Sequence, residues 1–161
     1  MPDRPDAVDG QILQFLQREG RASYAEVGAR VGMSAPSAHE RAKKLEARGV
    51  IRGYAALVDP VALGLGVLAF MFVRQAPGTV VTDLTEDFAA IPEIEECHHV
   101  AGEADYLLKV RAPDTRNLER ILRAIQTMPS VFATETQVVF STPFERRPLP
   151  TGRETGRAGE A

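Results

Sequence analysis

The sequence predicts an α+β protein in which an N-terminal winged helix-turn-helix is joined by a strand and linker to a C-terminal βαββαβ domain. Two observations predict this division. Residues 33–54 form a capped, cationic segment closed by glycine, and from residue 67 onward apolar runs alternate with helical periodicity. We expect a DNA-binding domain at 5–54, a linker at 55–65, a sheet domain at 66–142 and a disordered tail at 148–161.

A capped amphipathic helix is expected at the start of the chain. Asp6 is of a type that caps helix N-termini, and Val8, Ile12 and the pair Phe15–Leu16 recur at helical spacing. Gly20 marks the end of the segment. We expect this helix to pack its apolar stripe on the next two helices, in a unit of about 50 residues with one small core.

Two further helices joined by a tight turn are expected next. Ser23 and Glu26 have the spacing of a capping box, in which each side chain accepts from the other residue's backbone amide. Gly32 suits the turn because glycine tolerates a left-handed backbone. Ser34 is expected to cap the second helix and Gly49 to end it. Helix, glycine turn and capped helix in this order predict a helix-turn-helix.

The segment after this helix is expected to form the strand of a wing and then a linker. Val50–Ile51 is apolar, and Gly53–Tyr54 has the composition of a turn. Asp59–Pro60 breaks regular structure, and Gly64 and Gly66 favour irregular backbone. The boundary between the two domains is therefore expected here.

Positive charge is concentrated around the expected recognition helix. The chain has a net charge of −3, yet residues 30–52 hold six Lys or Arg against two Glu, whereas residues 60–142 hold six basic against eleven acidic side chains. A local basic patch on an acidic protein suits docking on double-stranded DNA at one end and another role at the other. The alternative is an ordinary helical hairpin with a solvated basic face.

Seven side chains of the helix-turn-helix are candidate DNA contacts. The start of a recognition helix enters the major groove, where hydroxyl and guanidinium groups reach base edges. The candidates for base edges are Ser34, Ser37 and Arg41. Contacts to phosphate position the protein without reading sequence. The candidates for phosphate are Arg30, His39, Lys44 and Arg48.

The second half of the chain alternates strands and helices. Its expected elements are a strand at Val67–Arg74, a helix through Val81–Ile91, strands at Ile94–Val100 and Tyr106–Arg111, a helix capped by Asp114, and a strand at Val131–Ser141. The order βαββαβ is a split βαβ arrangement. Its two helices cover one face of the sheet and leave the other open, with apolar residues such as Phe70 or Met71 on it. We therefore expect sheet-to-sheet homodimerisation.

Composition argues against several classes of protein. No apolar run reaches about 18 residues, so no membrane partner is expected. The N-terminus is polar, without the apolar core of a signal sequence. The single cysteine, Cys97, excludes an internal disulfide framework and fits a reducing cytoplasm. His98 and His99 follow it, but adjacent strand residues point to opposite faces, so no metal site is expected. No catalytic pair or phosphate loop is recognised, so neither a cofactor nor an enzymatic activity is expected.

Two halves of these types in this order resemble the Lrp/AsnC (leucine-responsive/asparagine-synthesis regulator, or feast/famine) family of bacterial and archaeal transcription regulators. The resemblance covers roughly Val8 to Thr142. The matching residues are Asp9–Leu13, Gly20–Arg21, Val31–Ser34, Arg41, Leu45–Glu46, Gly49–Tyr54, Asp59–Pro60, Glu96–His98, Val100–Lys109 and Thr134–Thr136. Each of these is weak alone, but the ordered set is specific.

The resemblance implies a ferredoxin-like C-terminal domain and homodimers that build higher oligomers. It also implies that an amino acid or similar small metabolite binds between dimers and alters promoter occupancy. At the turn after residue 99, Gly102 allows close approach of the backbone, turn amides suit an α-carboxylate, and Asp105 suits an α-ammonium. The expected effector contacts are His98, Val100, Ala101, Gly102, Asp105, Tyr106, Thr134 and Thr136, the two threonines being candidates to reach a neighbouring subunit's site. The alternative is that Gly102 and Asp105 only shape a hairpin.

Two positions depart from the family pattern. Gly28 lies where the family usually has alanine, and a glycine inside a helix costs up to about 1 kcal/mol. Ala104 lies in the effector turn where the family is often aromatic, which leaves the identity of the effector open.

Two other functional classes are compatible with this sequence. Sirohaem decarboxylases share this two-domain plan, and in them the histidines and arginines would serve a tetrapyrrole; the basic recognition segment argues against this. The second alternative is an amino-acid-binding assembly protein that does not bind DNA, which a gel-shift assay would distinguish.

Overall fold

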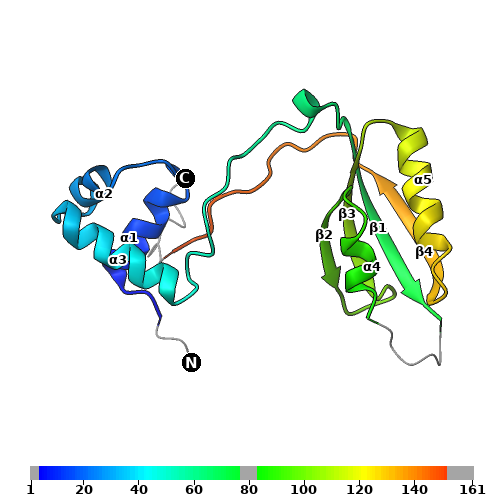
Figure 1. Ribbon diagram of the computed structural model, residues 1–161, viewed down its shortest axis with the longest axis horizontal. Coiled ribbons are helices and arrows are strands. Elements are labelled where there is room, and N and C mark those ends of the chain that lie inside the picture. Colours follow the sequence, from blue (N-terminus) through cyan, green and yellow to red (C-terminus); the bar gives the residue numbers. More distant parts are fainter. Residues whose placement is uncertain (1–3, 77–82, 152–161) are drawn as a thin grey trace, which may run out of the picture. The chain divides into compact units, whose positions relative to one another are not determined.

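The computed structural model describes residues 4–76 and 83–151, which divide into two compact units (Figure 1). The first is helical and contains the chain up to Leu57 together with the described residues from Phe144 onward. The second contains Val58–Pro143 and is built on a sheet. One unit is therefore continuous in sequence, and the other is not.

The helical unit consists of α1 (Ala7–Leu16), α2 (Tyr24–Val31) and α3 (Ala35–Ala47). Both predicted N-terminal caps of the first two helices are confirmed, each as a capping box: Asp6 with Asp9 on α1, and Ser23 with Glu26 on α2. Ser34 caps α3, as predicted. Its hydrophobic core contains Ile12, Leu16, Val27, Ala38 and Leu45, and Ala42 is also fully buried.

The strand expected at Val50–Ile51 does not form. The amides of Val50 and Ile51 both donate to the Leu45 carbonyl, at 2.9 and 3.2 Å, and so close the C-terminal end of α3. Gly49 takes a φ of +70° there, which glycine adopts without strain. Backbone groups that would pair in a wing are used to end the helix instead, and residues 50–57 contain no strand.

The sheet unit confirms the predicted βαββαβ order. Its elements are β1 (Val67–Gln75), α4 (Thr85–Ala89), β2 (Ile94–His99), β3 (Tyr106–Ala112), α5 (Thr115–Gln126) and β4 (Val131–Val138). The sheet is antiparallel, in the order β2-β3-β1-β4. A short 3-10 helix at Val61–Leu63 precedes it, where a linker was expected. The start of the helix expected from Val81 lies outside the described residues.

The two faces of the sheet differ in what covers them. Ala69, Met71 and Val73 of β1 are fully buried and pack with Leu118, Ile121 and Ile125 of α5. The alternate residues Phe70 and Phe72 point to the opposite face, where they are half-buried. Of the two residues proposed for the open face, Phe70 is there, and Met71 belongs to the core.

Residues 148–151, the first part of the tail expected to be disordered, lie against α1 and the residue that follows it. The Leu149 amide donates to Gln17 Oε1 at 2.6 Å, and Gln17 Nε2 donates to the Leu149 carbonyl at 3.1 Å. Thr151 Oγ1 donates to the Gly10 carbonyl at 2.7 Å. The local composition of the tail does not predict these contacts to α1. Residues 152–161, the rest of the predicted tail, lie outside the described residues.

Candidate functional site

Two glycines determine how α2 and α3 are joined and how closely they pack. Gly32 takes a φ of +71° between the helices, as the turn requires. Gly28, inside α2, is buried against the start of α3: a Cβ there would lie 2.6 Å from the Met33 carbonyl oxygen and 3.2 Å from the Ser34 carbonyl. The expected cost of a glycine inside α2 is thus accompanied by a packing role, because the absence of a side chain lets the two helices approach.

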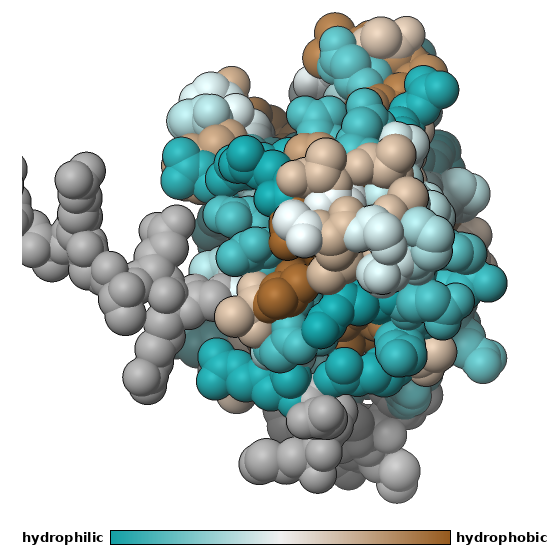
Figure 2. Space-filling view, turned by 90° about the vertical axis from the view of Figure 1, so that its left-hand side faces the viewer, coloured by the Kyte–Doolittle hydropathy of each residue, from teal (hydrophilic) through white to brown (hydrophobic). Residues whose placement is uncertain are grey.

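Several of the predicted DNA contacts lie exposed on this pair. Arg30, Ser37 and Lys44 are exposed, as is Lys43, which was not among the candidates. Their side chains form no ion pair with an acidic group in the described part of the chain. The side of Figure 1 on which α2 and α3 lie faces the viewer in Figure 2, and hydrophilic residues cover most of it.

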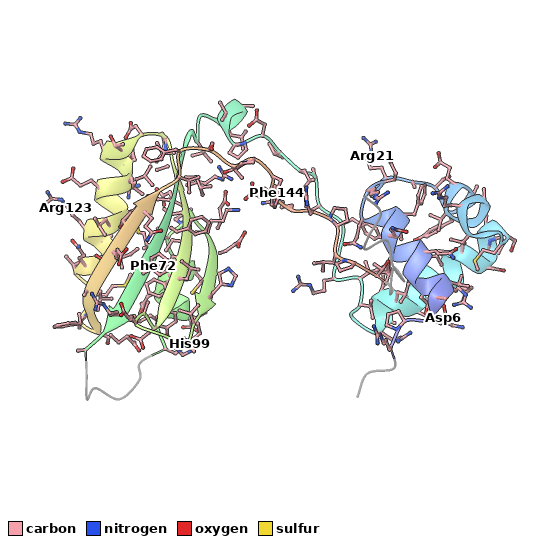
Figure 3. All side chains as sticks on the ribbon, turned by 180° about the vertical axis from the view of Figure 1, so that it is seen from behind. Asp6, Arg21, Phe72, His99, Arg123 and Phe144 are labelled. Carbon is pink, nitrogen blue, oxygen red and sulfur yellow. The ribbon has the colours of Figure 1, made fainter. Side chains whose placement is uncertain are left out.

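Arg41, which was predicted to read a base, forms ion pairs with α1 and its N-terminal cap in the structure without DNA. Arg41 Nη1 donates to Asp9 Oδ1 at 2.7 Å and to Asp6 Oδ2 at 2.8 Å. Asp6 lies at the start of α1 (Figure 3). Arg48 Nη1 lies 3.9 Å from the other oxygen of Asp9, so this predicted phosphate contact is also directed towards α1. The Asp9 backbone amide and then Arg41 hold the pKa of Asp6 below its usual range.

Two other candidates have structural partners as well. The Ser34 hydroxyl accepts from the Ser37 amide at 3.3 Å, and the two hydroxyls lie 2.9 Å apart. The His39 ring packs against Tyr24 with the ring centroids 4.5 Å apart. Ser34, Ser37 and Lys44 are all exposed. Within α3, Ser37 and Lys44 are the exposed candidates whose side chains form no hydrogen bond or ion pair to α1 or α2 in the described structure.

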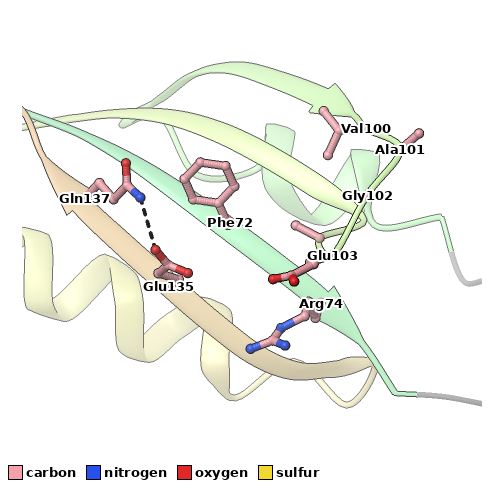
Figure 4. A pocket seen from close by; sticks show the side chains of 9 residues that line it. Phe72, Arg74, Val100, Ala101, Gly102, Glu103, Glu135 and Gln137 are labelled. Carbon is pink, nitrogen blue, oxygen red and sulfur yellow. Dashed lines mark hydrogen bonds between the residues drawn. The ribbon is translucent and has the colours of Figure 1, made fainter.

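The turn between β2 and β3 forms one wall of a hollow on the open face of the sheet. The hollow has a volume of about 380 Å³. Its lining residues are Phe72, Arg74, Val100, Ala101, Gly102, Glu103, Ala104, Glu135 and Gln137 (Figure 4). Gly102 takes a φ of +147°, which disfavours any side chain at this position. Of the predicted effector residues, Val100, Ala101 and Gly102 line this hollow.

Asp105 anchors the turn rather than lining the hollow. Its Oδ2 accepts from the Gln75 amide at 2.7 Å, and its own amide donates to the Val73 carbonyl at 2.9 Å. The Val100 amide closes the turn by donating to the Asp105 carbonyl at 2.9 Å. This is the hairpin-shaping alternative, and the carboxylate proposed for an α-ammonium is thus already engaged at the end of β1.

Tyr106, Thr134 and Thr136 face the other side of the sheet, so on a single chain they do not reach the hollow. Tyr106 is 2% exposed, and its hydroxyl accepts from the Leu84 amide at 3.3 Å. Thr134 Oγ1 accepts from Gln126 Nε2 of α5 at 2.8 Å. Thr136 pairs with Met71 and faces the same way, and its buried hydroxyl has no hydrogen-bond partner in the described structure.

Sequence reasoning missed the strand residues that line the hollow. Phe72 and Glu135 are paired across β1 and β4 and share its floor. Gln137 Nε2 donates to Glu135 Oε1 at 3.0 Å along the same face (Figure 4). The signal was available: residues alternate between faces along a strand, so choosing Thr134 and Thr136 for one face assigns Glu135 and Gln137 to the other.

A charged cluster occupies the same open face beside the hollow. The Lys109 side chain is only 5% exposed, and its Nζ lies 3.3 Å from Glu95 and 3.2 Å from Glu96. Arg111 Nε lies 2.6 Å from Glu95. Glu96 Oε2 lies 3.2 Å from the ring of His98, the remaining predicted effector contact. Burial tends to raise the pKa of Glu96, but hydrogen bonds to His98 and Lys109 outweigh it, so this pKa is lowered.

The described residues provide little for metal or membrane chemistry. No group of three or more His, Cys, Asp or Glu in residues 4–76 and 83–151 could hold a metal ion. Burial and then Asp83 raise the pKa of the exposed Cys97 thiol. Within the same residues, no helix has the length and apolar character needed to span a membrane.

Two family models match the chain. The AsnC-type helix-turn-helix domain matches residues 6–46, and the Lrp/AsnC ligand binding domain matches residues 68–149. The first match contains α1, α2 and all but the end of α3. The second contains the whole sheet except Val67, the first residue of β1.

Named relatives agree with these models. The chain is 34% identical over 145 residues to the HTH-type transcriptional regulator FL11 of Pyrococcus horikoshii, covering 90% of this chain and 95% of that protein. It is 40% identical over 139 residues to the leucine-responsive regulatory protein of Salmonella typhimurium, covering 83% and 84%. A similar solved structure is a feast or famine regulatory protein from M. tuberculosis complexed with L-methionine, with a TM-score of 0.86, 32% identity, and coverage of 90% and 98%.

Proposed function

The chain belongs to the Lrp/AsnC family of transcription regulators, and from this premise we propose that it binds promoter DNA through α3 and adjusts that binding to an amino acid held at the β2–β3 turn. It is a DNA-binding regulator with a ligand-binding domain and not an enzyme. The alternative of a tetrapyrrole enzyme has no support among the named relatives. We propose that the protein acts in the cytoplasm, where it would meet the DNA that it binds.

At the DNA end, the N-terminal turn of α3 enters the major groove. Ser37 is exposed there and has a hydroxyl that can donate to or accept from a base edge. Lys44 and Arg30, exposed on α3 and α2, contact phosphate and position the helix. Arg41 acts indirectly, because its ion pairs with Asp6 and Asp9 fix α3 on α1.

At the sensing end, the hollow beside the turn receives the amino acid. Backbone amides around Gly102 suit an α-carboxylate, because no side chain at this position blocks their approach. Arg74, at the end of β1, and Glu103, in the turn, supply charges of both signs at its rim (Figure 4). The L-methionine complex of the similar structure supports an amino acid as the class of ligand.

The open sheet face is proposed as the homodimer interface, and dimers as the unit of further assembly. Phe70 and Leu107 are half-buried on it outside the hollow, and no other element in the described part of the sheet unit packs over them. Lys109 and its glutamates are already paired within one chain, so a second copy would not have to neutralise them. Burying this face removes apolar area from water, which drives association.

The observation that carries the proposal is the glycine-separated pair of capped helices, with exposed cations on the second. The test is fluorescence anisotropy with a labelled DNA fragment from upstream of the protein's own gene and with a scrambled fragment, each at several salt concentrations. The titrations are repeated with L-methionine and then with each other proteinogenic amino acid. We expect salt-dependent binding to the fragment that at least one amino acid shifts. Binding that is equally weak for every DNA, at low salt and with every amino acid, would refute the proposal.

A further inference from the structure

The chain returns to the helical unit after leaving the sheet. Strand β4 ends at Val138, and the described residues from Phe144 onward belong to the same compact unit as α1, α2 and α3. The two units are thus joined by two stretches of chain: one before β1 and one after β4. The second stretch ends in hydrogen bonds to α1 at Gln17 and Gly10.

The contact at Gln17 recognises backbone. The side-chain amide of Gln17 bonds both the N–H and the C=O of Leu149, while Leu149 as a residue remains 73% exposed. Pro148 and Pro150 flank Leu149, and each proline fixes its own φ and favours extended backbone before it. The segment therefore loses less conformational freedom on docking than an ordinary chain would.

The contact at Gly10 is a site shaped to receive the segment. Gly10 is buried within α1, and a Cβ placed there would lie 2.9 Å from the Thr151 carbonyl oxygen. Glycine in a helix interior is unfavourable relative to alanine, so its presence needs a reason in the surroundings. Here the reason is the close approach of Thr151, whose hydroxyl also donates to the Gly10 carbonyl.

We propose that residues 144–151 form a strap that docks on α1 and couples strand β4 to the recognition helix. At one end, β4 carries Glu135 and Gln137, which line the hollow. At the other end, Gly10 is the neighbour of Asp9, the residue that holds Arg41 of α3. A change at β4 thereby has a continuous covalent and hydrogen-bonded route to the DNA-binding surface.

Hydrogen bonds are a suitable means of attachment for such a strap. Each is worth little net, since water replaces it when the segment leaves, and the exposed Leu149 side chain adds little apolar burial. The docked and undocked states are then close in free energy, so a modest preference of the ligand-bound state for one of them changes its population. The regulatory consequence rests on the proposed function, whereas the docking itself does not.

The docking is tested on the full chain by hydrogen–deuterium exchange, without DNA or ligand. In the wild type the Leu149 amide should be protected, because it donates to Gln17. Gln17→Ala should speed its exchange by about tenfold, and Gly10→Ala should do the same through the clash with Thr151. Gln14→Ala, a glutamine on the same helix with no hydrogen bond to the segment in the described structure, is the matched control. Equal, fast exchange of this amide in all four proteins would overturn the proposal.

The coupling is tested by the ratio of DNA dissociation constants with and without the amino acid that shifts binding most. Wild type and Gln14→Ala should share one ratio, and Gln17→Ala and Gly10→Ala should move it towards one. An unchanged ratio in variants whose Leu149 amide exchanges freely would overturn the coupling. A wild type that ignores DNA would instead refute the proposed function, while the exchange measurement would still decide the docking.

Discussion

The Asp9 carboxylate of α1 accepts a hydrogen bond from Arg41 of α3 at 2.7 Å, with the Asp9 side chain only 10% exposed. The other Asp9 oxygen accepts from the Asp6 amide at 3.3 Å, so one carboxylate serves both a helix cap and the recognition helix. The orientation of α3 is thus fixed by the first turn of α1.

Removing the Asp9 carboxylate should destabilise the protein without removing any group that touches DNA. Asp9→Ala leaves Arg41 with Asp6 alone and breaks the capping box. We expect the free energy of unfolding to fall by about 1–2 kcal/mol, a value discounted for the part-exposed Arg41. Urea denaturation measures it. Glu40→Ala, on an exposed residue of α3, is the control, and equal stability of the two variants would contradict the role given to Asp9.

Stability should decline in acid because three helix-capping carboxylates titrate. The pKa values of Asp6, Glu26 and Asp114 are lowered. The chief cause in each case is a hydrogen bond that the carboxylate accepts from a backbone amide. A carboxylate whose folded-state pKa lies below its unfolded value contributes stability at higher pH, and this is lost as the pH falls through the folded value. The loss should therefore begin below about pH 4.

Asp6→Asn isolates one of these groups. Asparagine can still cap α1 but does not titrate, so thermal melts should show a smaller loss of stability between neutral and acid pH than in the wild type. Glu19→Gln changes an exposed carboxylate that has no hydrogen bond in the described structure, and its acid profile should match the wild type. Identical profiles for all three proteins would refute the assignment.

Gly28→Ala should destabilise the helical unit although alanine is the better helix former. The gain in helix propensity is about 1 kcal/mol. It is outweighed by a Cβ placed 2.6 Å from the Met33 carbonyl oxygen, since overpacking of this kind costs roughly 1–3 kcal/mol. Chemical denaturation gives the sign. Gly20→Ala, whose Cβ would meet only an ordinary contact of 3.7 Å, serves as the control and should change stability by less than about 0.5 kcal/mol.

Lys44→Gln should weaken DNA binding without changing its sequence preference. A phosphate contact contributes to every sequence alike, so the slope of log affinity against log salt should fall by about one. Anisotropy titrations on the upstream fragment and on a scrambled fragment measure the salt dependence of the affinity and the preference for one sequence over the other. Arg123→Gln removes an exposed cation from α5 and should leave the slope unchanged. A loss confined to one DNA sequence would show that Lys44 reads bases.

Gly102→Ala should weaken amino-acid binding. The φ of +147° is strained for alanine, and the added methyl group lies where backbone and ligand are proposed to approach. Isothermal titration calorimetry with the responsive amino acid should show a raised Kd. Gly66→Ala, at a glycine with open space around it and no positive φ, is the matched control. Unchanged affinity in Gly102→Ala would remove this turn from the site.

Local signals predicted much of the fold. Caps such as Ser23 and Ser34 act within three residues of themselves, and apolar periodicity reports which face of an element is buried, so helices and strands could be placed from sequence. The prediction of the wing strand was wrong for an equally local reason. Gly49 ends α3, and the next two backbone amides donate to the Leu45 carbonyl instead of pairing in a strand.

The site was harder to predict because its residues meet across the chain. Arg41 has the chemistry of a base contact, and only its distance from Asp9 in space shows that it is already paired. Phe72 and Glu135 are far apart in sequence and adjacent in the sheet. Similarly, nothing in the proline-rich composition of residues 148–151 indicates that Gln17 and Gly10 receive them.

The helical unit is assembled from both ends of the chain, and this limits how it can be isolated. A fragment that stops in the linker would expose the bare side of α1 around Gly10 and Gln17, and it would lack a piece of its own surface. Fusing the two stretches by a short peptide, in place of the sheet, would restore that piece. A purification tag is accordingly better attached at a distance from Thr151, through a spacer, than directly after it.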